Sequence, residues 1–197
     1  RLHDAKVWRE ANPAESQWLE ENFAKGFDFA VSLTHALRDF GSLTENQVNA
    51  IRKCIVKSAE RAAEREARAA APKAEVDVTK IVDSFNKAFA NGIKRPKMRL
   101  ASFTFSRAPD TGKNPGALYI KGGDVYFGKV QDGKLHTSRE CTDDIKTAII
   151  DTIADPEQSA VAYGKRTGCC SICGRELSNK ESIDRGIGPI CAERFGW

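Results

Sequence analysis

Long apolar runs are absent from this 197-residue sequence, in which uninterrupted apolar stretches span only a few residues, as at 148–150. A membrane-spanning helix needs about 18 such residues, so we expect no membrane partner. The first thirty residues carry charges throughout, unlike a secretory signal peptide. We therefore expect a cytoplasmic protein.

Cysteine and histidine are also scarce. Six cysteines are too few for a disulfide scaffold of this length, and four of them lie in the last 29 residues. Clustering of this kind indicates a metal site more readily than disulfides. The three histidines are scattered, and no Ser/His/Asp or Cys/His set can be assembled from them with any specificity. We therefore expect a protein that is not an enzyme.

The composition is that of an ordinary globular protein, with 41% apolar and 29% charged residues. The net charge of +4 is unevenly distributed. Residues 71–137 carry twelve basic and six acidic side chains, whereas residues 1–70 are neutral and residues 138–197 are slightly acidic. A basic middle segment can attract polyanions, although a solvated basic surface without a partner would have the same composition.

The hydrophobic period changes along the chain and predicts an α+β fold. Apolar residues recur at helical spacing through residues 14–59 and 76–91, and the period becomes two from Met98. Thr44 and Gln47 form the pattern of a capping box at a helix start. We expect helices in the N-terminal half, a small antiparallel sheet with packed helices, and a C-terminal zinc finger. The expected divisions are a helical region at 1–71, a linker at 72–75, an α+β domain at 76–165 and a zinc-finger module at 166–197.

The densest basic cluster leads into a segment that alternates with period two, residues 98–107. On one continuous strand the aromatic residues would share a face with two arginines, a plausible platform for single-stranded nucleic acid. The alternative is that the two phenylalanines face the core. The candidate nucleic-acid-binding residues are Lys94, Arg95, Lys97, Arg99, Phe103, Phe105 and Arg107.

Three cysteines near the C-terminus have the spacing of a zinc site. Cys170 and Cys173 form a Cys-x-x-Cys-Gly turn, and Cys191 follows a Gly-Pro that can open a short helix. Structural zinc is bound by four protein ligands in a tetrahedron. The fourth ligand stays open at this point: the candidates are Cys169, which adjoins Cys170, and His136 and Cys141 from the β segment. Buried cysteines without a metal are the alternative.

The C-terminal motif resembles a known group of proteins. The motif runs Cys170-x-x-Cys173-Gly174-Arg175-x-Leu177-Ser178-x-x-x-Ser182, then Gly186-Ile187-Gly188-Pro189-x-Cys191, and closes with Phe195-Gly196-Trp197. It is similar to an uncharacterised zinc-finger family common in tailed-phage and mobile-element proteins. The resemblance implies a small zinc module and a host cytoplasm as the site of action, and it implies no activity.

Two functions are compatible with these patterns. The first is a non-enzymatic zinc protein that binds nucleic acid, with DNA favoured over RNA. The second is an adaptor or inhibitor that docks on a host protein, which the neutral helical half and the acidic C-terminal third favour. The sequence alone does not separate them.

Overall fold

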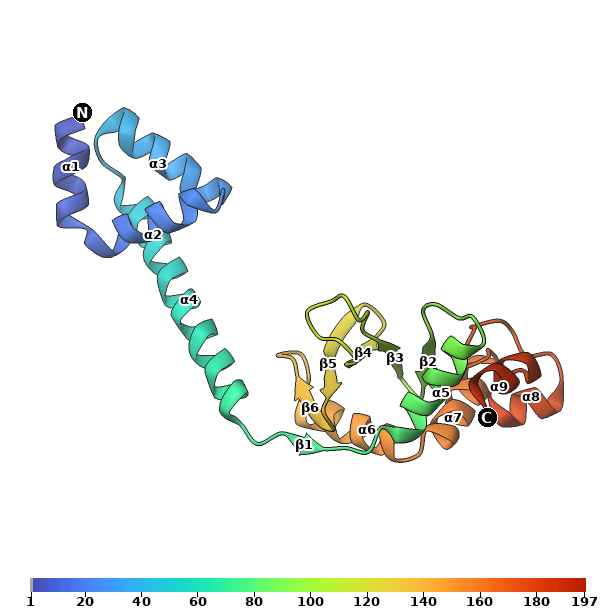
Figure 1. Ribbon diagram of the computed structural model, residues 1–197. Coiled ribbons are helices and arrows are strands. Elements are labelled where there is room, and N and C mark those ends of the chain that lie inside the picture. Colours follow the sequence, from blue (N-terminus) through green and yellow to red (C-terminus); the bar gives the residue numbers. More distant parts are fainter. Residues whose placement is uncertain (1) are drawn as a thin grey trace. The chain divides into compact units, whose positions relative to one another are not determined.

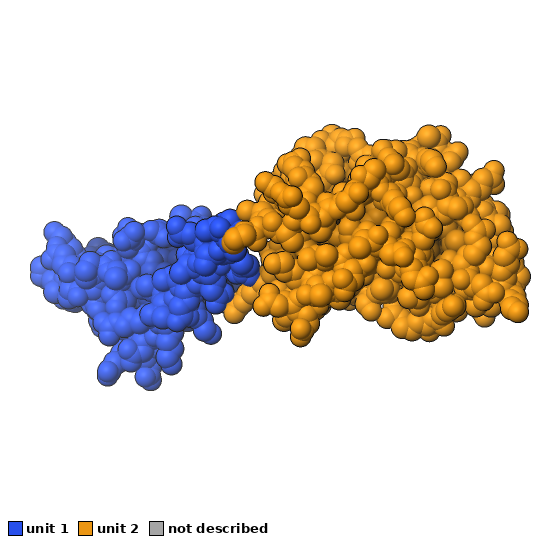
Figure 2. Space-filling model, turned by 90° about the horizontal axis from the view of Figure 1, so that it is seen from below, with its two compact units in different colours: residues 1–71 blue, residues 72–197 orange. Residues whose placement is uncertain are grey.

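The computed structural model describes residues 2–197, and the chain divides into two compact units, residues 1–71 and residues 72–197 (Figure 2). Each unit has its own hydrophobic core. We refer to them as unit 1 and unit 2. No apolar side chain is shared between the two cores.

Unit 1 is entirely helical. Its helices are α1 (Leu2–Ala11), α2 (Pro13–Ala24), α3 (Asp28–Phe40) and α4 (Glu45–Ala70) (Figure 1). Leu19, Leu33, Leu37 and Ile51 are among its buried residues. The second half of α4 contributes nothing to this core, since its side chains beyond residue 55 are almost all exposed.

The start of α4 has the local structure that the sequence predicts. The Thr44 side chain accepts a hydrogen bond from the backbone N–H of Gln47, and the Gln47 side chain accepts one from the backbone N–H of Thr44. This reciprocal pair satisfies two N–H groups that would otherwise be unpaired at a helix start. α4 is joined to α2 by an ion pair of 2.6 Å between Arg52 and the buried carboxylate of Glu15.

Unit 2 is built on an antiparallel six-stranded sheet in the order β1-β6-β5-β4-β3-β2. The strands are β1 (Ala74–Glu75), β2 (Lys97–Leu100), β3 (Phe103–Arg107), β4 (Leu118–Gly122), β5 (Val125–Gln131) and β6 (Lys134–Thr137). The helices are α5 (Thr79–Ala90), α6 (Asp143–Ala154), α7 (Pro156–Thr167), α8 (Lys180–Arg185) and α9 (Pro189–Phe195). The predicted α+β class is thereby confirmed.

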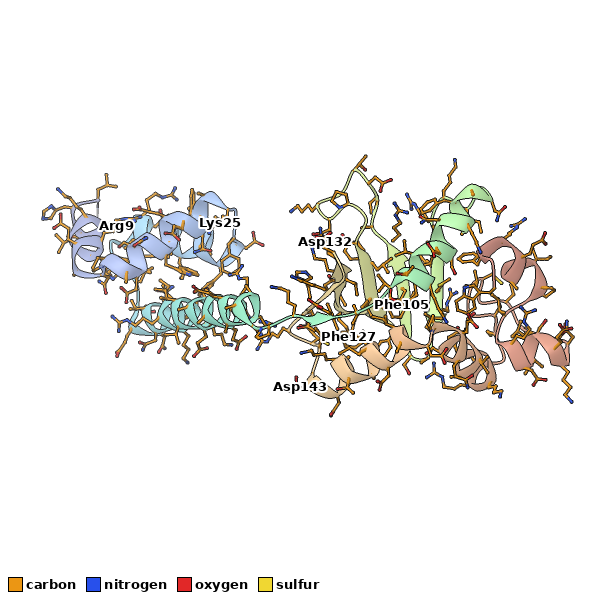
Figure 3. The ribbon with its side chains drawn as sticks, turned by 60° about the horizontal axis from the view of Figure 1, so that its bottom comes forward. Arg9, Lys25, Phe105, Phe127, Asp132 and Asp143 are labelled. Atoms are coloured by element: carbon orange, nitrogen blue, oxygen red, sulfur yellow. The ribbon has the colours of Figure 1, made fainter. Side chains whose placement is uncertain are left out.

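One face of the sheet is covered by helices. In Figure 1, α6 and α7 run along one side of the strands, with α5 beside β2. The core between the sheet and these helices contains Phe85 of α5, Ile149 of α6 and Ala160 of α7. Phe105 and Phe127 belong to the same interior, and both are labelled in Figure 3. We call the opposite side of the sheet the outer face.

The segment 98–107 is not the single strand that its alternation predicts. It forms two strands, β2 and β3, joined by a tight turn in which Ala101 has a φ of 49°. Residues 74–75, expected in a linker, form β1 and pair with β6. The turn carries no strong local signal, because Ala101-Ser102 lacks the Gly, Asn or Asp that favours such a turn. The edge strand β1 has only two residues, too few to show an alternating pattern.

Candidate metal centre

Three cysteine side chains meet at the C-terminal end of unit 2. The sulfur atoms of Cys170, Cys173 and Cys191 all lie within 4.8 Å of one another. Tetrahedral zinc with Zn–S bonds of about 2.3 Å would hold two sulfurs about 3.8 Å apart, so the cluster has the dimensions of such a site. These three cysteines can therefore hold a metal ion.

The Cys170–Cys173 turn is shaped by its backbone. The N–H of Gly174 donates to the carbonyl of Cys170 at 2.9 Å, and Gly174 has a φ of 75°, a conformation that a side chain would strain. The N–H of Cys170 donates to the carbonyl of Arg175 at 2.8 Å. This tight turn directs both sulfurs toward one point.

Cys191 comes from a different element. It lies in the first turn of α9, which begins at Pro189. The N–H of Gly188, just before this helix, donates to the sulfur of Cys170 at 3.5 Å. The start of α9 thus supplies one ligand candidate and a hydrogen bond to another.

The thiols differ in acidity. Burial is the largest effect on Cys170 and would raise its pKa, but backbone N–H groups of Gly188, Cys173 and Ile172 together lower the pKa below the ordinary value. Burial, followed by the proximity of Cys170 and Cys173, raises the pKa of Cys191 to about 12. Neighbouring thiolates repel one another, and a bound metal cation would offset this repulsion and keep its ligands deprotonated.

The cysteine turn is tied to the edge strand β2. The backbone N–H of Arg99 donates to the carbonyl of Ser171 at 2.7 Å, and its guanidinium donates to the carbonyl of Ile172 at 2.6 Å. The end of the chain is anchored as well, since the indole N–H of Trp197 donates to the Ser84 hydroxyl of α5 at 2.5 Å. We call residues 170–197, which carry the three clustered cysteines, the metal segment. This segment is part of the core of unit 2.

None of the proposed fourth ligands joins the cluster. Within the described part of the chain, no further His, Cys, Asp or Glu lies close enough to belong to it. Cys169 forms a β-bridge with Glu176, His136 lies on β6, and Cys141 packs against the core just before α6. A cavity of about 380 Å³ adjoins the three sulfurs, and Glu176 is among the residues that line it.

The candidate nucleic-acid-binding residues are dispersed by the fold. Phe103 and Phe105 are 6% and 0% exposed, so neither ring can stack on a base and the aromatic platform expected there is wrong. They face the helices because the strands of this sheet turn every second side chain toward the core. Lys94, Arg95 and Lys97 are exposed at the start of β2.

The two arginines are engaged within the protein. Arg99 holds the cysteine turn, as described above. Arg107 shares the covered face with Phe105, donates to Asn86 at 2.9 Å and lies 5.2 Å from the centre of the Phe89 ring. It also pairs with Asp110 at 3.5 Å. Their main contacts are structural, which the basic pattern of the sequence did not reveal.

A family of unknown function, DUF6011, matches residues 160–196, which include the last two turns of α7 and the three clustered cysteines. No curated protein and no solved structure matches the chain. The matched region thus includes the motif that resembles a zinc-finger family, and the match assigns no activity.

No helix within residues 2–197 combines the length and the hydropathy that crossing a membrane requires.

Proposed function

We propose that unit 2 is a zinc-stabilised domain that binds nucleic acid without catalysing a reaction. The resemblance of its C-terminal motif to phage and mobile-element proteins supports DNA as the target and a host cytoplasm as the setting. The metal segment packs into the same core as the sheet, which supports a structural role for the ion. Zinc is the preferred metal because all three clustered ligands are thiolates.

One observation carries the nucleic-acid proposal. Lys94 and Arg95 lie in the connection between α5 and β2, and Lys97 is the first residue of β2. All three are exposed, and none has an ion-pair partner among the described residues. Cations without a carboxylate partner remain available for phosphate groups. Each phosphate contact releases a counterion, so binding should weaken steeply with salt.

The nucleic-acid proposal is tested by fluorescence anisotropy with labelled single- and double-stranded oligonucleotides at two salt concentrations. A double substitution, Lys94→Glu with Lys97→Glu, should abolish most binding and reduce the salt slope by roughly one for each lysine. The matched control is Lys53→Glu with Lys57→Glu, two exposed lysines on α4 of unit 1. Equal binding by the double variant and the parent would refute the proposal.

The zinc proposal is tested by metal analysis of the purified protein, which should give about one zinc per chain. Cys173→Ser should release the ion and increase hydrogen exchange throughout unit 2, since the metal segment contributes Ile172, Leu177 and Phe195 to that core. Unit 1 should stay protected because its core is separate. A metal-free protein with a protected C-terminal segment would contradict this role.

A protein-docking function is the second candidate, and one feature of unit 1 favours it. Trp18, Phe27 and Phe29 form a cluster with ring centroids 6.1–6.2 Å apart, in which Phe27 remains 47% exposed. Exposed aromatic clusters are frequent in protein interfaces. If the anisotropy titration shows no binding at low salt, this function replaces the first.

A further inference from the structure

The outer face of the unit 2 sheet carries mainly polar and basic side chains, whereas the covered face carries mainly apolar ones. On each strand the residues that alternate with the buried ones point to this face. One cross-strand row is fixed by the pairing register and runs from β2 to β6, about 19 Å across the sheet. Its members are Lys97, Ser106, Tyr119, Lys129 and His136.

Positive charge dominates this face. Lys97 and Lys121 are exposed, and Lys129 hydrogen bonds only neutral partners, the side-chain oxygens of Asn114 and Gln131. The acidic residue in the paired registers is Glu75 on β1, opposite Lys134 at the sheet edge. Lys129 therefore keeps a positive charge that no carboxylate neutralises in the described hydrogen bonds and ion pairs.

The titration of His136 agrees with this environment. Burial is the largest effect that lowers its pKa, and the nearby ammonium groups of Lys73, Lys129 and Lys134 lower it further, with Asp132 opposing them. Of the four charged groups that act on His136, three are cations, so the charge around this side chain is positive. An anionic ligand would find a complementary surface here.

Two tyrosines lie within this basic face. The rings of Tyr119 and Tyr126 are 6.1 Å apart with an interplanar angle of 74°, and Tyr126 is 39% exposed. The side-chain amide of Asn114 donates to the Tyr119 hydroxyl at 3.1 Å, and Lys129 donates to the same Asn114. The orientation of Tyr119 is thus fixed by neighbours, and Tyr126 presents its ring beside it.

We propose that the outer face binds single-stranded nucleic acid, with a base stacked on Tyr126 and the phosphates on Lys97, Lys121 and Lys129. The inference rests on the proposed function and narrows its ligand to single strands. Bases in a duplex are already stacked on each other, whereas an unpaired base can stack on an exposed aromatic ring. A lysine-lined face with two tyrosines therefore favours single strands over duplexes.

The test measures the affinity of the full chain for labelled oligo(dT), oligo(U) and a duplex of equal length. Tyr126→Leu should weaken single-strand binding roughly 5- to 150-fold, the loss of one stacked base, and leave duplex binding unchanged. Tyr126→Phe should bind within about twofold of the parent because the ring is retained. The control is Tyr163→Leu on α7, a tyrosine outside the sheet, which should bind like the parent.

Charge reversal on the same face gives a second readout. Lys121→Glu replaces an exposed lysine at the register position of Tyr126 and should weaken single-strand binding while the melting temperature stays near that of the parent. If neither Tyr126→Leu nor Lys121→Glu changes the affinity for nucleic acid, or if the protein binds the duplex more tightly than the single strands, this inference is wrong and the proposed function still stands. The absence of any binding at low salt would overturn both.

Discussion

The substitution Phe103→Ala distinguishes a phenylalanine that packs in the core from one that stacks on a nucleic-acid base. Phe103 is 6% exposed and lies edge-on to Phe127, with ring centroids 5.9 Å apart. Truncating a buried phenylalanine costs about 3–5 kcal/mol, because apolar contacts are lost and a cavity remains. A domain is stable by roughly 5–15 kcal/mol, so unit 2 should lose a large share of its stability.

The measurement is urea unfolding of the zinc-loaded protein. With a slope of roughly 1–3 kcal/mol per M, the midpoint of the unit 2 transition should fall by about 1 M or more. Phe40→Ala is the matched control, since that ring is 76% exposed on unit 1 and should change stability by less than about 0.5 kcal/mol. An unchanged midpoint together with lost oligonucleotide binding would show that Phe103 stacks on bases and that its place in the core is wrong.

Three further predictions concern other contacts. Arg52 lowers the pKa of the buried Glu15 below its ordinary 4.5, so this carboxylate stabilises unit 1 above pH 4.5 and the contribution is lost as the pH falls through the lowered value. Glu15→Gln should therefore destabilise unit 1 at neutral pH but not in acid, as followed by circular dichroism, and a constant difference at all pH values would contradict the ion pair. Gly164→Ala should lower the melting temperature of unit 2, because the new Cβ would lie 2.4 Å from the Cα of Gly186; a melt like that of the parent would exclude this close approach. Arg99→Met removes the side-chain hydrogen bond to the cysteine turn and should weaken zinc binding roughly 10- to 100-fold in a chelator competition, whereas unchanged affinity would mean that the turn holds its shape alone.

Local patterns in the sequence predict the elements that local chemistry determines. The capping box at Thr44 and Gln47 depends on residues three positions apart, and the structure contains both of its hydrogen bonds. β4 and β5 form a hairpin around Gly122-Gly123-Asp124, a local sequence that favours a tight turn. The Cys170–Cys173 turn can likewise be predicted from the sequence, because two candidate ligands and a glycine lie within five residues.

The faces of the sheet depend on distant segments and could not be predicted in the same way. Alternation shows that Phe103 and Phe105 share a face, but only the positions of α5, α6 and α7 decide that this face is covered. The same alternation places Tyr119 on the outer face through its pairing with Ser106, a register that no single strand encodes. The choice among Cys169, His136 and Cys141 as a fourth ligand could not be made from the sequence for the same reason, since it depends on which segment folds against the three cysteines.

The three clustered cysteines and the basic surface are connected through β2. Lys97 projects from the first residue of this edge strand, and two residues later Arg99 makes a backbone and a side-chain hydrogen bond to the cysteine turn. An edge strand leaves one row of backbone groups unpaired, and here the turn supplies a partner for part of that row. An ion bound by the three cysteines would therefore stabilise both the C-terminal segment and the strand that presents Lys97. This connection gives a physical reason for a metal segment and a basic sheet to occur in one domain.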